Sequence, residues 1–205
     1  MTPSSATPRK VFLGITGASG ALYGVRTLQM LVEAGVEVSL CVSDPARRVL
    51  WEECDLRFDA DPAPLLVPGQ DSSRVCVHSN QDIGAPPASG TALGDLALVV
   101  PCSLSTLGRI AAGSAERLIE RAAHVALKEG RPLILVPRET PLSRIHLEGM
   151  SRLAWAGATI LPASPGFYHR PRTVLDLVDH VCAKVLDVCR IPQTRVRPWT
   201  GGKPG

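Results

Sequence analysis

The sequence has few aromatic residues and no excess of charge of one sign. Aromatic side chains make up 4% of the 205 residues, so a core must be aliphatic, as is typical of parallel sheets. A net charge of +3 gives no reason to expect nucleic acid or an anionic membrane as a partner. No apolar run reaches the length of a membrane span, and residues 1–10 lack an apolar signal segment. We therefore expect a cytoplasmic protein.

The chain also lacks the usual cysteine patterns. Its six cysteines form no CxxC pair and no metal-like spacing with the five histidines. Several of them lie in apolar runs, where cysteine behaves as a small hydrophobic residue. We interpret them as reduced thiols of a cytosolic chain and expect no bound metal.

What the sequence does have is a regular alternation of apolar strand patterns with amphipathic helix patterns. Such alternation predicts parallel βαβ units and a doubly wound α/β sandwich with a mostly parallel sheet. The length suits one domain, expected over 11–191, with a disordered leader over 1–10 and a loose tail over 192–205. The first strand is expected to begin at residue 11, and the others at 36–43, 74–79, 96–101, 132–137 and 158–163. Helices are expected at 21–34, 44–53, 105–113, 114–130, 143–157 and 173–190.

A glycine-rich turn, "GITGASGALYG", follows the first strand. Its Gly14, Gly17 and Gly20 have the spacing GxxGxxG, which is neither the GxGxxG of dinucleotide folds nor a P-loop. Glycines allow a ligand close to the backbone, and the following helix start offers free N–H groups to an anion. The turn predicts a phosphate or flavin cradle; a tight turn that merely needs glycine is the alternative.

Three further strand ends carry polar side chains, and the last of them, "PASPGFYHRP", offers Tyr168, His169 and Arg170, with packing as the alternative for the tyrosine. "PCSLSTL" places Ser103, Ser105 and Thr106 at a helix start, where hydroxyls act as N-caps or line a phosphate pocket. "LVPRETPL" places Arg138 and Glu139 directly after a buried strand. A surface ion pair is the alternative there, but an arginine fork fits phosphate oxygens and a glutamate can move a proton. Because ligands bind beyond the carboxyl ends of parallel strands, the pattern favours a phosphorylated ligand.

These segments, together with "PPASG", "RAAHVALKE", "IHLEGM", "GFYHRP" and "IPQ", resemble the UbiX family of flavin prenyltransferases from about Val11 to Trp199. The resemblance implies a flavodoxin-like Rossmann three-layer sandwich. It also implies metal-independent joining of reduced FMN, at N5 and C6, to the dimethylallyl group of a prenyl monophosphate. The prenylated FMN would then serve a UbiD-type decarboxylase. Finally, it implies a homo-oligomer, commonly a dodecamer, with sites at subunit junctions.

The resemblance also implies roles for individual residues. The residues expected to be catalytic are Ser19, Glu53, Lys128, Glu139 and Tyr168. FMN binding falls to Gly17, Ala18, Ser19, Ser43, Ser103, Ser105, Thr106 and Arg121. Prenyl phosphate binding falls to Ser89, Gly90, Lys128, Arg138, Glu139, Tyr168 and Lys184. Fixed cations suit this chemistry because a departing allylic phosphate develops negative charge.

Two positions depart from the family pattern. Lys184 stands where an arginine is usual, which keeps the charge but loses the bidentate fork, and Ile83 stands where many members have tryptophan. Two other functions remain as alternatives. One is an FMN-dependent decarboxylase of cysteine-containing peptides, whose PxMN-type segment and catalytic histidine are not matched here. The other is a non-catalytic flavin carrier, which would not need paired proton donors at a phosphate site. The histidines are interpreted as structural or surface groups.

Overall fold

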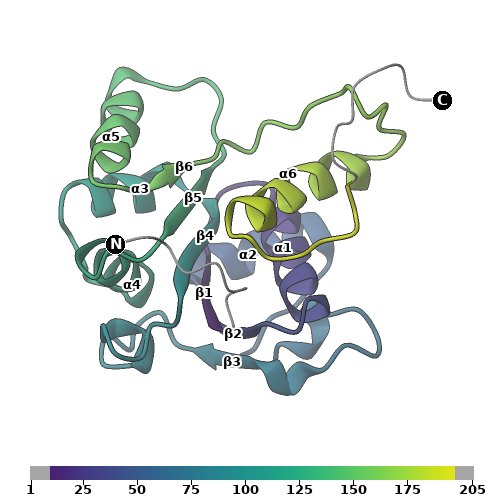
Figure 1. Ribbon diagram of the computed structural model, residues 1–205, viewed down its shortest axis with the longest axis horizontal. Helices are drawn as coiled ribbons and strands as arrows, with labels where there is room; N and C mark the ends of the chain where they lie inside the picture. Colours follow the sequence, from purple (N-terminus) through teal and green to yellow (C-terminus); the bar gives the residue numbers. More distant parts are fainter. Residues whose placement is uncertain (1–9, 197–205) are drawn as a thin grey trace.

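A computed structural model of the protein describes residues 10–196. Its strands form one sheet in the order β3-β2-β1-β4-β5-β6, and every neighbouring pair is parallel (Figure 1). The doubly wound α/β prediction is therefore confirmed. The strands are β1 (Lys10–Ile15), β2 (Glu37–Val42), β3 (Val75–His78), β4 (Leu96–Cys102), β5 (Leu133–Pro137) and β6 (Thr159–Ile160). Most of the expected leader, and the end of the expected tail with Trp199, lie outside the described residues.

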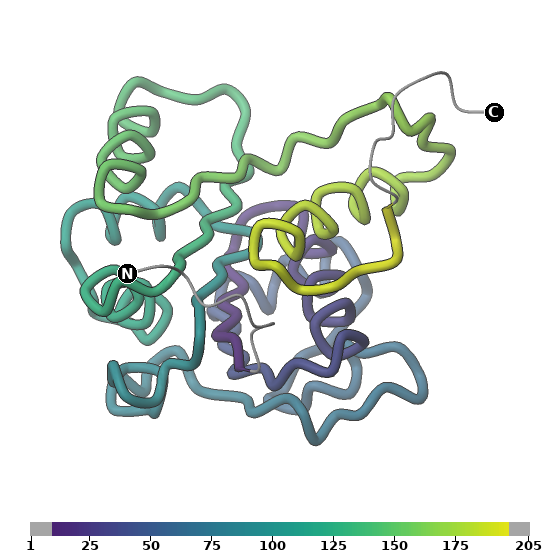
Figure 2. Tube along the Cα trace, viewed as in Figure 1, coloured from purple at the N-terminus to yellow at the C-terminus, as the bar shows by residue number. Residues whose placement is uncertain are grey.

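Helices cover both faces of the sheet, as Figures 1 and 2 show. One apolar core joins the sheet to α1, α2 and α6, and a second core joins its other face to α3, α4 and α5. The helices are α1 (Ala21–Glu33), α2 (Asp44–Cys54), α3 (Leu104–Ala111), α4 (Leu118–Lys128), α5 (Arg144–Trp155) and α6 (Val174–Val188). Short 3₁₀ turns occur at η1 (Ala63–Leu65), η2 (Ser72–Arg74) and η3 (Pro86–Ala88). No helix in the described part of the chain is both long and apolar enough to span a membrane.

The strand order creates the position at which a ligand binds such a sheet. β1 pairs with β2 on one side and with β4 on the other, so the chain winds outward from β1 in both directions. Loops after β1 and β4 therefore leave toward opposite faces, and a crevice opens between them at the carboxyl ends of the strands. The glycine turn and the "PCSLSTL" segment follow these two strands directly.

Two elements differ from the sequence-based expectation. The helix expected over 114–130 begins only at Leu118, whose N–H donates to the carbonyl of Asn80, so the preceding residues form a separate connection from α3. The strand expected over 158–163 is reduced to β6, with two residues. Pro162 follows closely, and proline cannot donate to a strand ladder, so a short edge strand results.

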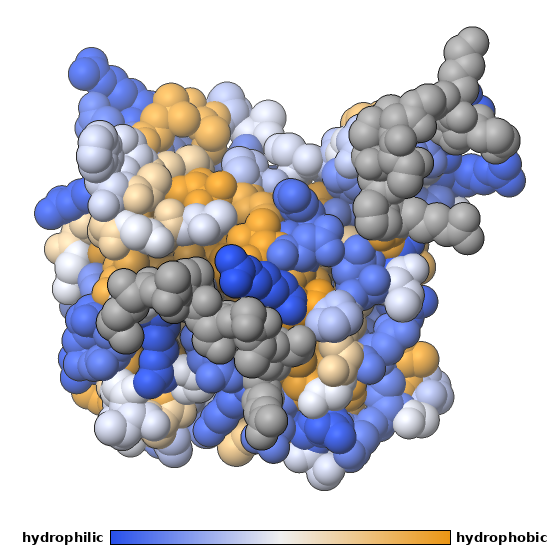
Figure 3. All heavy atoms as spheres, in the orientation of Figure 1, coloured by the Kyte–Doolittle hydropathy of each residue, from blue (hydrophilic) through white to orange (hydrophobic). Residues whose placement is uncertain are grey.

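Helix α5 is attached to the domain by a small part of its surface. Of its 12 residues, all of them described, Leu153 alone is buried. Ile145 is 78% exposed and Trp155 90% exposed. Figure 3 shows apolar side chains gathered at this end of the molecule, beside α5. Exposed large apolar side chains of this kind mark a surface that another molecule can cover.

Close packing of α1 on β4 requires a glycine. A Cβ added at Gly24 would lie 2.5 Å from the carbonyl oxygen of Val100, a backbone atom that cannot turn aside. We predict that Gly24→Ala lowers the free energy of unfolding by about 1–3 kcal/mol, because overpacking shifts the helix. Urea denaturation measures this change.

Gly108 in α3 provides the matched control. A Cβ there would meet no atom within 4 Å, so Gly108→Ala should leave stability unchanged or raise it by up to about 1 kcal/mol. Equal midpoints for the two variants would contradict the packing argument.

Candidate functional site

A cavity of about 400 Å³ lies at the carboxyl ends of β1, β4 and β5. This volume falls within the range of roughly 300–1,000 Å³ that small-molecule sites occupy. Three separate strand ends contribute to it, as the sequence pattern predicts. Its lining consists of Gly17, Ala18, Ser103, Leu104, Ser105, Leu107, Gly108, Arg138, Glu139, Ile145, His146 and Gly149.

Local packing accounts for two glycines of the turn after β1. A Cβ at Gly17 would lie 2.4 Å from the Cβ of Pro45, and Gly20 has φ 94°, in the left-handed region. Both glycines are therefore needed by the turn itself. Gly17 and Ala18 nevertheless line the cavity, so the structural reason and a role beside a ligand coexist.

Glu53 caps the start of α1 from the neighbouring helix α2. Its Oε2 accepts hydrogen bonds from the backbone N–H groups of Gly20 (2.7 Å) and Ala21 (3.0 Å). A carboxylate is stabilised at this position by the free N–H groups and the helix dipole. Because Ser19 immediately precedes Gly20, the structure brings together two residues expected to be catalytic. The sequence alone gave no sign of this cap.

A network of hydroxyl groups fixes the start of α3. The Ser103 hydroxyl caps the helix by accepting from the Thr106 N–H (3.3 Å) and lies 3.0 Å from the Thr106 hydroxyl. The backbone N–H of Ser103 donates to the Thr16 hydroxyl (2.7 Å). Ser105 is exposed and faces the cavity. The capping interpretation thus holds for Ser103, and Ser105 remains available to a ligand.

Ser43, the other serine expected at the flavin, ends β2 and caps α2. Its hydroxyl accepts a hydrogen bond from the N–H of Ala46 at 3.3 Å. It is buried and does not line the cavity, although α2 begins beside the glycine turn through the contact of Pro45 with Gly17.

An ion pair behind the cavity escaped the sequence analysis. Arg109 of α3 donates through Nε to Oε1 of Glu120 in α4 at 2.7 Å, and its Nη2 lies 3.3 Å from the Thr106 hydroxyl. The side chain of Glu120 is only 2% exposed, whereas that of Arg109 is 44% exposed. The pair therefore connects a buried carboxylate to the hydroxyl network at the start of α3. No sequence signal identifies it, because the partners belong to different helices.

Arg138 and Glu139 leave β5 at the edge of the cavity. Arg138 donates through Nε to the backbone oxygen of Ser19 at 2.8 Å, which ties the end of β5 to the glycine turn. The bond uses Nε and leaves both terminal nitrogens of this cavity-lining arginine out of it. Glu139 is exposed, and its Oε1 accepts a hydrogen bond from the N–H of Thr140 at 3.1 Å. A cation and a carboxylate thus stand together at the cavity, as the sequence predicts.

His146 also lines the cavity, although the sequence indicated only that it lies near the "PRETPL" loop. It closes a capping box at the start of α5: its N–H donates to the Ser143 hydroxyl at 3.3 Å, and Nδ1 accepts from the Ser143 N–H at 3.2 Å. Because Nδ1 is an acceptor, the neutral ring carries its proton on Nε2. His146 is therefore both a helix cap and a cavity residue.

A second group of expected site residues lies elsewhere in the chain. Lys128 ends α4, which leads into the amino end of β5, so this lysine lies at the opposite edge of the sheet. Its Nζ contacts Oε1 of Glu129 at 2.9 Å, and this bond holds the pKa of Glu129 below its usual value. A Cβ on Gly90 would lie 2.3 Å from the same Oε1. Ser89 and Gly90 therefore lie beside Glu129 and Lys128. Arg121 is exposed near the start of α4, about 10 Å along the helix from Lys128.

A third group includes Tyr168 and Lys184. Figure 1 shows the chain after β6 running away from α5 to the far side of the molecule before α6 begins. Tyr168 lies on this segment, and its Oη is 3.0 Å from Nε2 of His180 in α6. Lys184 follows one turn later and is exposed. Neither Tyr168 nor Lys184 lines the cavity at the carboxyl ends of β1, β4 and β5.

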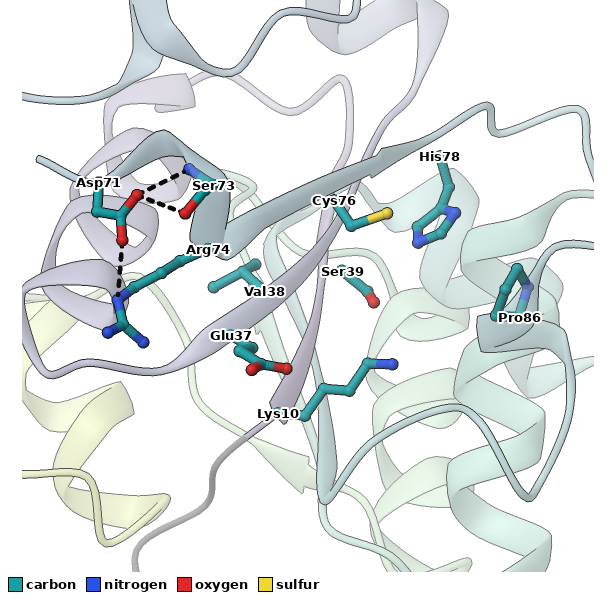
Figure 4. A pocket seen from close by; sticks show the side chains of 10 residues that line it. All are labelled: Lys10, Glu37, Val38, Ser39, Asp71, Ser73, Arg74, Cys76, His78 and Pro86. Atoms are coloured by element: carbon teal, nitrogen blue, oxygen red, sulfur yellow. Dashed lines mark hydrogen bonds and ion pairs between the residues drawn. The ribbon is translucent and has the colours of Figure 1, made fainter.

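Another cavity, of about 370 Å³, lies along the edge formed by β2 and β3 (Figure 4). Figure 4 shows Asp71 bonded to Ser73 and paired with Arg74, with the sulfur of Cys76 directed toward His78. Burial lowers the pKa of His78. None of the residues expected in the functional site lines this cavity.

Two buried cysteines, in β2 and at the end of β4, do not act as nucleophiles. Burial raises the pKa of Cys41 and of Cys102 to about 12, so both stay protonated thiols near neutral pH. All six cysteines, each within the described residues, are free. The cavity therefore offers hydroxyl, carboxylate and guanidinium groups for chemistry.

The chain is similar to known flavoproteins in sequence and in structure. The sequence pattern of the family described as Flavoprotein matches residues 2–194. The flavin prenyltransferase UbiX of Pseudomonas aeruginosa is 46% identical to the chain over 197 residues, 94% of each protein. A crystal structure of AnUbiX in complex with FMN and dimethylallyl pyrophosphate has a TM-score of 0.87 at 36% identity, covering 95% of this chain and 99% of that one. The crystal structure of a dodecameric FMN-dependent UbiX-like decarboxylase from Escherichia coli O157:H7 has a TM-score of 0.85 at 41% identity. The match covers 94% of this chain and 100% of that one.

Glu120→Ala tests how much the buried ion pair contributes to stability. We predict a loss of about 1.5–3 kcal/mol in the free energy of unfolding, because a hydrogen bond to a charged group is removed while Arg109 can turn to solvent. Glu148 supplies the control, since it bonds Arg144 at 2.9 Å on an exposed helix face. Glu148→Ala should change stability by less than about 1 kcal/mol. Similar losses in both variants would contradict the importance of burial.

Proposed function

Since this chain belongs to the UbiX family of flavin prenyltransferases, we propose that it joins the dimethylallyl group of a prenyl monophosphate to N5 and C6 of reduced FMN. The prenylated FMN would serve a UbiD-type decarboxylase. The observation that carries the proposal is the cavity at the carboxyl ends of β1, β4 and β5. There Arg138 and Glu139 stand opposite the hydroxyl groups that open α3.

The residues of this cavity fit FMN. Ser105 and the network of Ser103 and Thr106 present hydroxyl groups at the start of α3, where backbone N–H groups and the helix dipole favour a phosphate. Gly17 and Ala18 line the adjacent wall without bulky side chains, which leaves room for a flat ring. The flavin supplies the nucleophilic positions of the reaction.

The charged residues suit the departure of an allylic phosphate. Arg138, a lining residue of the cavity, is held in place by its bond to the Ser19 backbone before negative charge develops. Glu139 is beside it and exposed, and in its protonated form it would pass a proton to the leaving phosphate. Glu53, at the start of α1 beside Ser19, is placed to remove a proton during ring closure. Basic side chains thus take the part that a metal ion takes elsewhere.

The complete site is proposed to form where copies of this chain meet. Within one chain Lys128, Ser89 and Gly90 lie at the opposite edge of the sheet from Arg138, and Tyr168 lies on a third segment. The exposed apolar surface of α5, next to the cavity, needs a covering molecule. A dodecamer in which neighbouring copies supply the Lys128 group and the Tyr168 group would satisfy both requirements.

The two departures from the family pattern affect the substrate side. Lys184 offers a single ammonium rather than a planar fork, so its hold on the phosphate is less directional. Ile83 is 56% exposed within one chain and offers an aliphatic wall in place of an aromatic one. We expect these changes to alter the affinity for the prenyl donor more than the binding of FMN.

Mass analysis of the flavin tests the reaction. The purified protein is incubated with FMN and dimethylallyl monophosphate under anaerobic reduction, and the extracted flavin is expected to gain one C₅H₈ unit. Glu139→Gln should slow the reaction roughly 100-fold or more, because the proton donor is lost. Glu148→Gln is the control: it removes the same negative charge, but from an exposed position on α5 outside the cavity lining, so it should react like the wild type. Unmodified FMN that still co-purifies would contradict prenyl transfer and leave flavin carriage or cysteine-peptide decarboxylation.

Mixing two inactive variants tests the shared site. Lys128→Ala and Arg138→Ala should each be inactive alone, but coexpressed chains should recover about a quarter of wild-type activity. In a random mixture each copy at a junction is either variant with equal chance. About a quarter of the junctions therefore combine an intact Lys128 from one copy with an intact Arg138 from its neighbour. Coexpression of Arg138→Ala with Glu139→Gln is the control, since both changes fall on the same strand end and no junction regains an intact pair. Equal recovery in both mixtures would contradict the proposal.

A further inference from the structure

His180 contacts the tyrosine expected in the prenyl phosphate site through one ring nitrogen and the backbone through the other. Its Nε2 lies 3.0 Å from Tyr168 Oη, and its Nδ1 accepts a hydrogen bond from the N–H of Gly166 at 3.3 Å. The histidine therefore links α6 to two points of the segment before it. Neither the family pattern nor the sequence analysis gives this histidine a role.

The two bonds together determine where the proton of the neutral ring lies. A backbone N–H can only donate, so Nδ1 must be the acceptor. The neutral imidazole then carries its hydrogen on Nε2, which donates to Tyr168 Oη. As the acceptor of this bond, Tyr168 must direct its own O–H hydrogen away from the His180 ring.

The rings around this bond are tightly packed. The ring of Tyr168 meets the ring of His180 edge to face, with centroids 5.5 Å apart. The ring of His169 stacks on that of His180, with centroids 4.7 Å apart and planes 5° apart, and also meets Tyr168 edge to face at 5.8 Å. A Cβ on Gly166 would lie 2.8 Å from Tyr168 Cε1 and 3.3 Å from His180 Cε1. The segment thus has a glycine at the point where two rings close over the backbone. Although Tyr168 is 57% exposed, these contacts lie along one edge of its ring and favour the orientation that meets His180.

We propose that His180 is a positioning residue that holds Tyr168 with its O–H hydrogen directed at an oxygen of the prenyl phosphate. The inference rests on the proposed function, in which Tyr168 contacts that phosphate. Lys184, one turn along α6, stands beside the same position with its positive charge. A hydroxyl donor and an ammonium would then reach the phosphate from one helix and the segment packed against it.

The arrangement needs a neutral imidazole. Burial lowers the pKa of His180, and the nearby His169 and Lys184 lower it further. Tyr168 faces the ring from the preceding segment, and the adjacent Asp179 is bound to Arg26 of α1. Since the pKa in the folded protein is depressed, the ring stays neutral through the usual histidine range and becomes charged only as the pH falls through the lowered pKa. Protonation would place a hydrogen on Nδ1 against the Gly166 N–H and break that bond, so the ring would lose one of its two attachments while Nε2–H still donates to Tyr168 Oη.

Four variants in the complete oligomer test the role. His180→Phe keeps a ring but removes both hydrogen bonds, and we expect a roughly 10-fold rise in KM for dimethylallyl monophosphate, the effect of one lost hydrogen bond. Tyr168→Phe should show a rise of similar size. The double variant should be no worse than Tyr168→Phe alone, because both changes remove the same interaction. His180→Gln, whose amide can donate toward Oη, should recover much of the loss and should lack the wild-type decline in activity at acid pH.

The outcomes separate this inference from the proposed function. Prenyl transfer by the wild type with an unchanged KM in His180→Phe, or with additive losses in the double variant, would overturn only the role of His180. A fall in FMN affinity or melting temperature that matched the activity loss, with no rescue by glutamine and no change in pH profile, would show a purely structural role and would also overturn it. A wild type that leaves FMN unmodified would overturn the proposed function, and the role of His180 with it.

Discussion

The geometry of the cavity depends on the side chain of Thr16, which ties the ends of β1 and β4 together. Its hydroxyl donates to the carbonyl of Pro101 at 2.8 Å and accepts from the N–H of Ser103 at 2.7 Å. The first bond fixes the end of β4 against the glycine turn, and the second fixes the start of α3. Arg138 adds β5 by bonding the backbone of Ser19. Because Thr16 is 2% exposed, water does not compete for these bonds, and three strand ends are held in one arrangement before any ligand arrives.

The sequence predicted the elements that carry these groups but not the bonds among their side chains. Parallel strands place their carboxyl ends at one edge, so "GITGASG", "PCSLSTL" and "LVPRET" could be assigned to one region from their order alone. Residues at the ends of α4 could not be placed in this way, because helices run back to the opposite edge. The same reasoning put Tyr168 at a strand end, but its segment leaves the sheet and bonds His180 of α6 instead. Their role came from family resemblance, and the fold separates Lys128 and Tyr168 from Arg138.

The interactions that escaped prediction have a common physical reason. Glu53 caps a helix other than its own, Arg109 pairs with a carboxylate on α4, and His180 bonds a loop tyrosine twelve positions earlier. Each depends on how two elements pack, and neither periodicity nor spacing encodes that packing. For His180 a glycine is the one local sequence feature involved, because a Cβ at Gly166 would strike the rings of Tyr168 and His180.

Exposure within one chain has a consequence for the chemistry. Glu139 and Lys128 are both exposed, yet a developing allylic cation must be kept from water and the charges around it act strongly only in a dry site. A single chain cannot provide that environment, since its three groups of site residues face solvent in different places. If neighbouring copies bring them together, the same contacts that bury the apolar surface of α5 also exclude water from the reaction. Assembly would then be part of catalysis, because it creates the low dielectric in which Arg138 and Lys128 stabilise the departing phosphate.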